Sequence, residues 1–228
     1  MKTEIKQIAF TLVEILLVLA IIGITATLTI PNLKHNYDEE VTIARLRKAQ
    51  VDLNRAYASA VAKYGEYELW GVSDSKKAAR LTEFLKGREC STGSTHCWPD
   101  GAANGHTVFE LEDGTVLDIF FGSASIEIAV APFGSKNGYD EGKTVFAFNM
   151  STKSDSKGLT NCTEGSNLEY PRDTFIPQGY CQDVKQDNSY ALSVTSKYFY
   201  SNWAVFNGNL DYNKCPEKLN WIGNTTCQ

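Results

Sequence analysis

The chain has 228 residues, of which 43% are hydrophobic and 21% are charged, and its formal net charge is −5. This length allows one domain with a proper core plus an appendage, and the composition is that of a folded protein rather than a disordered one. The acidic balance leaves no basic footprint, so nucleic acid is not favoured as a partner.

The chain begins with a polar leader, residues 1–9, followed by an apolar run from Phe10 to Ile30 in which Glu14 is the single charged residue. As a helix these 21 residues span roughly 30 Å, the thickness of the hydrocarbon core of a membrane. Two lysines against one glutamate make the leader weakly positive, which orients it toward the cytoplasm. No A-x-A cleavage site follows the run, so we expect the run to stay on the mature protein.

The stretch AFTLVEILLVLAIIGI, from Ala9 to Ile24, resembles the type III prepilin signal of type IV pilins and of the pseudopilins of type II secretion systems. The resemblance implies that a prepilin peptidase cuts between Ala9 and Phe10 and methylates the new amino terminus. Glu14 then matches the family's glutamate five residues into the mature chain, and Pro31 matches its helix-kinking proline. The family usually has glycine before the cut. Alanine is also small, so cleavage is expected, with slower processing as the open alternative.

The same resemblance, which extends to about residue 55, implies a filament subunit that polymerises through its N-terminal helix. The partners it implies are other pilin or pseudopilin subunits, the prepilin peptidase, the inner-membrane assembly platform and membrane lipid. It places the chain in a bacterial inner membrane as a single-pass protein with an extracytoplasmic C-terminal domain, and later in a surface pilus or a periplasmic pseudopilus. The alternative is an anchored adhesion or binding domain that never polymerises, which leaves the carboxylate of Glu14 unexplained.

Beyond Pro31 the pattern stays helical, and an amphipathic continuation is predicted over 31–64, ending at Gly65. Its apolar residues recur at steps of three, four and seven: Ile43, Leu46, Leu53, Tyr57, Ala60 and Tyr64. Gln50 interrupts this stripe. Pro31 removes a backbone donor and therefore predicts a kink.

Residues 65–228 are expected to form one globular domain. A short helix is predicted from Ser73 or Asp74 to Gly87, with Lys76, Lys77 and Arg80 on a solvated face. Two alternating runs then flank Asp113-Gly114, the strongest hairpin signal in the chain. SIEIAVAP and KTVFAFNM read as two further strands.

These elements predict an α+β fold that resembles a pilin: a long N-terminal helix, transmembrane in its first half, packed on an antiparallel sheet of about four strands. A disulfide-rich C-terminal region follows. Residues 190–212 are expected to hold one or two more strands, with a helix near Val194 as the alternative.

All six cysteines lie beyond residue 89, which indicates an oxidising compartment. Six cysteines allow many connectivities, and we favour the sequential one, in which each pair closes a short loop. The pairs are Cys90–Cys97, Cys162–Cys181 and Cys215–Cys227. The last loop resembles the disulfide-bounded loop that many pilins display outward.

Two metal sites are weaker alternatives. Cys90, His96, Cys97 and His106 have poor spacing for tetrahedral zinc, because adjacent His96 and Cys97 rarely both ligate one ion. Asn137, Asp140 and Glu141 offer oxygen ligands for calcium but lack the alternating spacing of an EF-hand loop. No P-loop, G-x-S-x-G, H-E-x-x-H or G-x-G-x-x-G motif occurs, so we expect no enzymatic activity and no cofactor.

Overall fold

A computed structural model describes residues 12–90, 97–98, 105–152, 172–178, 200–219 and 223–227, with the backbone only over 31–36. The chain divides into two compact units, Met1–Glu39 and Glu40–Gln228. Helix α1, Leu12–Tyr64, contributes residues to both units. The helix is not interrupted at Pro31, and the kink there stays a prediction.

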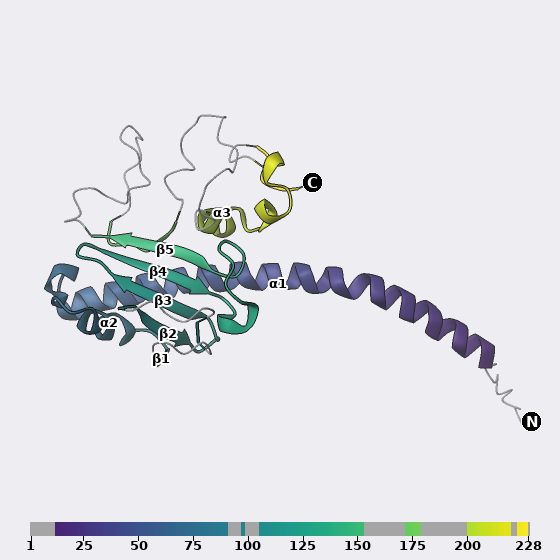
Figure 1. Cartoon of the computed structure of the whole chain (residues 1–228), viewed down its shortest axis with the longest axis horizontal. Coiled ribbons are helices and arrows are strands. Elements are labelled where there is room, and N and C mark those ends of the chain that lie inside the picture. The colour runs from purple at the N-terminus through teal and green to yellow at the C-terminus, as the bar shows by residue number, and fades with distance from the viewer. Residues whose placement is uncertain are drawn as a thin grey trace, which may run out of the picture. The chain divides into compact units, whose positions relative to one another are not determined.

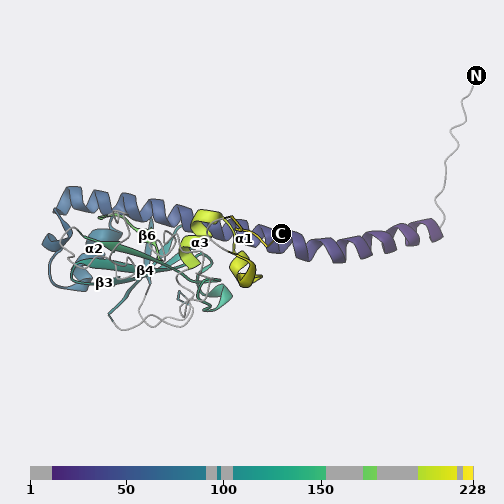
Figure 2. The same ribbon diagram turned by 90° about the horizontal axis from the view of Figure 1, so that it is seen from above.

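The core of the second unit lies between α1 and one face of an antiparallel sheet (Figures 1 and 2). The predicted apolar stripe of α1 is confirmed: five of its members are buried, and Tyr64 is partly buried against the core. The opposing side chains come from alternate positions of the strands, as the two-residue period of a strand requires. Leu117 and Ile119, for example, are fully buried.

The sheet has six strands among the described residues, and their spatial order follows the chain order, with every neighbouring pair antiparallel. The strands are β1 Gly87–Cys90, β2 Thr107–Leu111, β3 Val116–Phe121, β4 Ser125–Ala131, β5 Phe146–Ser151 and β6 Ile176–Pro177. The four predicted strands are β2 to β5. The edge strands β1 and β6 are additional.

The hairpin predicted at Asp113-Gly114 joins β2 to β3. The amide of Leu111 donates to the carbonyl of Thr115 at 2.8 Å, and that of Gly114 donates to the carbonyl of Leu111 at 2.9 Å. Gly114 has φ +80°, a conformation that glycine adopts without steric cost. The Asp113 carboxylate accepts the amide of Thr115 at 3.0 Å and lies 2.9 Å from the Lys48 ammonium, so it ties the turn to α1.

The predicted short helix is α2, Asp74–Thr82, and Ser73 is its N-cap. It ends at Thr82, earlier than expected, and the amides of Phe84 and Leu85 instead donate to the carbonyls of Leu81 and Thr82, so the chain turns before β1 begins at Gly87. The expectation of a solvated face is wrong for Lys77, which is 8% exposed. Its ammonium donates to the carbonyl of Gly122 at 2.8 Å and lies 4.9 Å from the centre of the Tyr67 ring.

The strand expectation for 190–212 is wrong over its described part, where Tyr200–Asn207 forms helix α3. The outer edge of β5 is already occupied there. β6 pairs with Phe148 and Asn149, and the hydroxyl of Ser201 accepts the amide of Ala147 at 2.8 Å. The Val194 alternative lies outside the described residues. The described residues also contain four short 3-10 segments: η1 Tyr67–Trp70, η2 Gly134–Asn137, η4 Asp211–Asn213 and η5 Pro216–Lys218.

Candidate functional site

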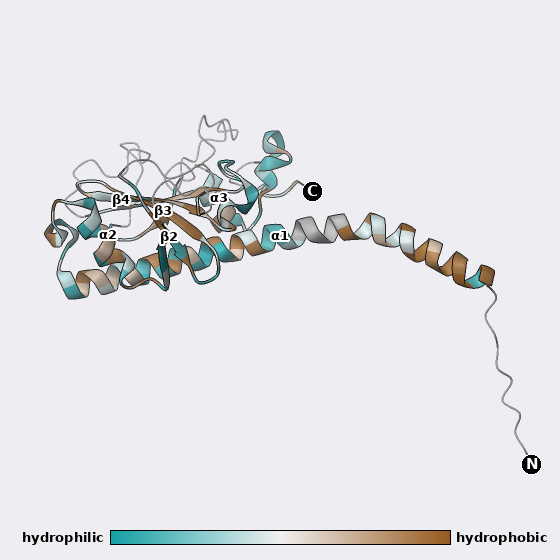
Figure 3. Cartoon of the chain, turned by 60° about the horizontal axis from the view of Figure 1, so that its bottom comes forward, coloured by the Kyte–Doolittle hydropathy of each residue, from teal (hydrophilic) through white to brown (hydrophobic). Residues whose placement is uncertain are grey.

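The apolar N-terminal part of α1 is the main candidate site. Over Leu12–Ile30 the mean hydropathy is 2.4 and none of the window is buried, so this segment is long and apolar enough to cross a membrane (Figure 3). Its large exposed side chains are Leu12, Val13, Ile15, Leu16, Leu17, Val18, Leu19, Ile21, Ile22, Ile24, Leu28 and Ile30. An apolar surface of this extent marks a contact with lipid or with other apolar protein segments.

Glu14 is the acidic residue in the first turn of α1. In the hydrocarbon core of a membrane, a charged side chain costs a few kcal/mol and usually marks a functional position. Ala9 and Phe10, which flank the predicted cut, lie outside the described residues, and the backbone at Pro31 is helical.

Three threonines near the end of the segment satisfy their hydroxyl groups within the helix. Thr25 Oγ1 donates to the carbonyls of Ile21 and Ile22, each at 3.0 Å, and Thr27 Oγ1 donates to that of Ile24 at 2.9 Å. Thr29 donates to the carbonyl of Thr25. Such back-bonding lets polar side chains enter lipid without leaving a donor unpaired. The sequence analysis missed this role, although the i−3 and i−4 reach of threonine was the available signal.

Two disulfides match two of the pairs expected from the sequence. Cys90 and Cys97 are joined with Cα atoms 6.3 Å apart, and Cys215 and Cys227 with Cα atoms 5.8 Å apart. The expected pair Cys162–Cys181 lies outside the described residues. Disulfides agree with an oxidising compartment.

The zinc alternative does not fit the structure. The sulfur atoms of Cys90 and Cys97 are bonded to each other and are not available as thiolate ligands, even though Glu110 lies beside them. His106 pairs with Asp118 instead, with its Nδ1 3.0 Å from Oδ1. Burial raises the pKa of Asp118, and this outweighs the opposing effect of His106. His96 lies outside the described residues.

The calcium alternative gains no support. The backbone carbonyl of Asp140 accepts three amides of its own turn, those of Lys143, Thr144 and Val145, at 2.8 to 3.2 Å. The Lys143 ammonium lies 3.9 Å from the Asp140 carboxylate. Among the described residues, the acidic side chains of Asp140 and Glu141 do not join any close set of three His, Cys, Asp or Glu ligands. Asn137 ends a separate 3-10 turn, η2 Gly134–Asn137.

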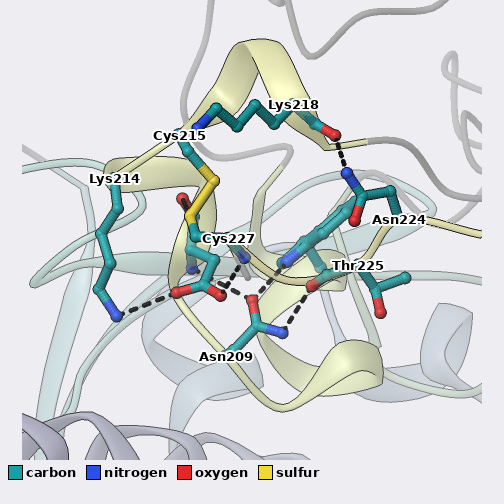
Figure 4. The surroundings of a disulfide bond; sticks show 9 residues. Asn209, Lys214, Cys215, Lys218, Asn224, Thr225 and Cys227 are labelled. Carbon is teal, nitrogen blue, oxygen red and sulfur yellow. Dashed lines mark hydrogen bonds and ion pairs between the residues drawn. A yellow bond between two sulfur atoms is a disulfide. The ribbon is translucent and has the colours of Figure 1, made fainter.

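The loop closed by Cys215 and Cys227 is held by a hydrogen-bond network as well as by its disulfide (Figure 4). Asp211 Oδ2 accepts the Cys227 amide at 2.9 Å, and Oδ1 accepts the Lys214 ammonium at 3.0 Å. Burial by itself raises the pKa of Asp211, but these hydrogen bonds outweigh it and hold the pKa below its ordinary value.

Asn209 joins this loop to the core. Its Oδ1 accepts the indole N–H of Trp203 at 2.9 Å, and its Nδ2 donates to the carbonyl of Thr225 at 2.9 Å. Trp203 is fully buried in α3, so the side-chain amide of Asn209 connects the backbone at Thr225 to a fixed point of the core. The described residues of the C-terminal loop are therefore tied to the core by hydrogen bonds as well as by the disulfide.

Comparison of the chain with protein-family models, with curated proteins and with solved structures finds no match in any of the three. The features that bear on function are an exposed apolar helix with one carboxylate, a helix packed on an antiparallel sheet, and disulfide-closed loops.

Proposed function

We propose that this chain is a structural subunit of a type IV pilus or of a type II secretion pseudopilus. In this proposal prepilin peptidase cleaves it before Phe10 and methylates the new amine, and the subunit polymerises through its N-terminal helix. The observation that carries the proposal is the exposed apolar segment Leu12–Ile30 with Glu14 in its first turn. The packing of α1 against an antiparallel sheet also supports it, because the resemblance to pilins implies a layout of this kind.

The position of Glu14 has a simple electrostatic explanation in this proposal. Cleavage creates a cationic amine on Phe10, four residues before Glu14 in the chain. In a staggered filament the amine of one subunit meets the carboxylate of its neighbour. The attraction between opposite charges is strong in a low-dielectric surrounding. A contact between the two charges in lipid would therefore favour assembly at one axial register.

The test replaces Glu14→Val, which keeps the segment apolar. We expect membrane insertion and cleavage to be unchanged and the fraction of subunits recovered in sheared filaments to fall sharply. Glu89→Val is the matched control, since it makes the same substitution at an exposed position of β1 where a β-branched residue suits the strand. The control should assemble at the wild-type level.

A Glu14→Val subunit that is processed and incorporated as well as the control would remove the main support for the proposal. Failure of the wild-type chain to enter any filament, together with a mature chain that keeps residues 1–9, would instead favour the anchored domain that does not polymerise.

A further inference from the structure

Three asparagines of the chain are followed directly by glycine: Asn104, Asn137 and Asn207. This dipeptide is prone to spontaneous deamidation. The backbone nitrogen after the asparagine lies within reach of the side-chain Cγ, and glycine has no Cβ to obstruct the attack. Asn104 lies outside the described residues. The structure describes the other two sites, and they differ in exposure and in packing.

The site at Asn137 is open to water and to base. Asn137 ends η2, and both Asn137 and Gly138 are exposed. Among the described residues, no atom beyond the chain neighbours lies within 4 Å of the position that a Cβ of Gly138 would occupy. The Gly138 amide donates to the carbonyl of Ser135 at 3.4 Å, whereas a normal N–H···O bond measures about 2.7–3.2 Å. This bond therefore protects the amide only weakly.

Asn207 is the comparison within the same molecule. It ends α3, and the amide of Gly208 donates to the carbonyl of Ala204 at 3.2 Å. The side-chain Nδ2 of Asn207 is buried. Arg47 crowds the glycine, because its Nη2 lies 3.1 Å from the position that a Cβ of Gly208 would occupy. Ring closure at this site must first loosen packed structure, which costs free energy.

We propose that Asn137 is a deamidation site, at which the folded protein gradually exchanges an amide for a carboxylate. The nitrogen of Gly138 attacks Cγ of Asn137 and forms a C–N bond. The side-chain nitrogen leaves as ammonia and takes the proton that the Gly138 nitrogen loses. Water then opens the cyclic imide at either carbonyl and yields aspartate or isoaspartate. In sum, asparagine and water give the acid and ammonia, with no oxidant, reductant or cofactor.

The product adds one negative charge to a surface loop that also contains Asp140. Contacts that do not involve Asn137 hold the next part of this loop. The carbonyl of Gly138 accepts the hydroxyl of Thr144 at 2.9 Å, and the same hydroxyl accepts the amide of Asp140 at 2.8 Å. We therefore expect the modified protein to stay folded and to be separable from the unmodified protein by ion exchange.

The test incubates the full-length protein in detergent at mildly alkaline pH in heavy-oxygen water. Only acid formed during the incubation then carries the label, because digestion takes place in ordinary water. Trypsin cuts after Lys136 and Lys143, so Asn137 lies in a short peptide of its own, and tandem mass spectrometry measures the labelled acid. In the folded protein we expect Asn137 to react at least about tenfold faster than Asn207.

The matched control is the same incubation in denaturant with the disulfides reduced. The local sequence alone then sets the rate, so Asn137 and Asn207 should react at comparable rates. Asn137→Gln is the control variant, since glutamine keeps a neutral amide at the exposed position but must close a larger ring. The variant should melt at the wild-type temperature, and its peptide should gain far less labelled acid.

The proposal is overturned if Asn137 keeps its amide in the folded protein, or if Asn137 and Asn207 react at the same rate in the folded protein. Products that contain aspartate but no isoaspartate would show direct hydrolysis of the side-chain amide and would refute the attack by Gly138.

Discussion

Asn54 holds the start of β6 on α1 through a reciprocal pair of hydrogen bonds, and its removal should destabilise the second unit. Its Oδ1 accepts the amide of Phe175 at 2.6 Å, and its Nδ2 donates to the carbonyl of Phe175 at 3.2 Å. Gln50 donates to the same carbonyl at 3.1 Å. Phe175 is fully buried, so its backbone groups depend on these amides.

Asn54→Ala leaves the Phe175 amide without its acceptor, while the carbonyl keeps Gln50. A buried donor left unsatisfied costs about 1–3 kcal/mol, and the second lost bond adds about 0.5–1 kcal/mol. We therefore expect a loss of about 2–3 kcal/mol, which lowers Tm by about 5–10 °C in a domain of this size. Gln50→Ala removes one of two donors to a single carbonyl and should cost only about 0.5–1 kcal/mol.

Thermal unfolding of the full chain in detergent, with disulfides intact and tryptophan fluorescence as the signal, measures both effects. Trp70 and Trp203 are fully buried and report on this unit. Arg55→Ala, at an exposed position of the same helix, is the control and should be near neutral. The reasoning fails if Asn54→Ala unfolds at the control temperature, or if Gln50→Ala costs as much as Asn54→Ala.

Three further predictions follow from the processing motif, the cysteines and the C-terminal loop. Intact mass spectrometry should show a mature chain that begins at N-methylated Phe10, and a chain that still begins at Met1 would contradict this. Loss of two lysines and one glutamate with the leader changes the formal side-chain charge from −5 to −6. Non-reducing peptide mapping should find all three sequential pairs, including Cys162–Cys181, and replacing Cys215 and Cys227 by alanine should cost about 3 kcal/mol in the entropy model. Asp211→Asn should destabilise by about 1 kcal/mol at pH 7. The pKa of Asp211 in the folded protein lies below its ordinary value of 3.8, so the extra stability of the wild type over Asp211→Asn should be lost as the pH falls below 3.8. Melting temperatures of the two proteins measured over a pH series test this. A difference in melting temperature that persists in strong acid would contradict it.

The sheet was predictable where side-chain period and turn chemistry agree. Asp113-Gly114 specifies a hairpin by local backbone preference. Alternate residues of β2 and β3 face the core against α1, and Val108 and Val116 on the other face join a second, smaller apolar cluster. β1 and β6 were not predictable, because Gly87–Cys90 has no apolar alternation and Ile176–Pro177 has only two residues. Their pairing depends on neighbours that the local sequence does not reveal.

Helix α3 is an element whose type the sequence predicts wrongly. Tyr200, Trp203, Val205 and Phe206 have the β-branched and aromatic character of a strand. The segment is helical because tertiary contacts override that preference, with Trp203 and Ala204 fully buried.

The candidate site, the apolar segment Leu12–Ile30 with Glu14, could be predicted from hydropathy alone, whereas long-range contacts of α1 could not. In the sequence, Gln50 only interrupts the apolar stripe of α1. In the structure, its side chain donates to the carbonyl of Phe175, which lies 125 residues further along the chain. The hydrogen bond from the Tyr57 hydroxyl to Asp173 was not predictable, because the two residues lie 116 positions apart in the sequence.

The sequential order of the strands also has a consequence for how the domain folds. Strands that are neighbours in the sheet are also consecutive in the chain. The sheet can therefore grow one strand at a time from the tight β2–β3 hairpin. The hydrogen bonds from the side chains of Asn54 and Gln50 in α1 to the Phe175 carbonyl instead join residues that lie 121 and 125 positions apart. Closing so long a loop is entropically costly and slow compared with forming a hairpin. A chain synthesised from its N-terminus would thus complete most of its sheet before the far edge is fastened to the helix.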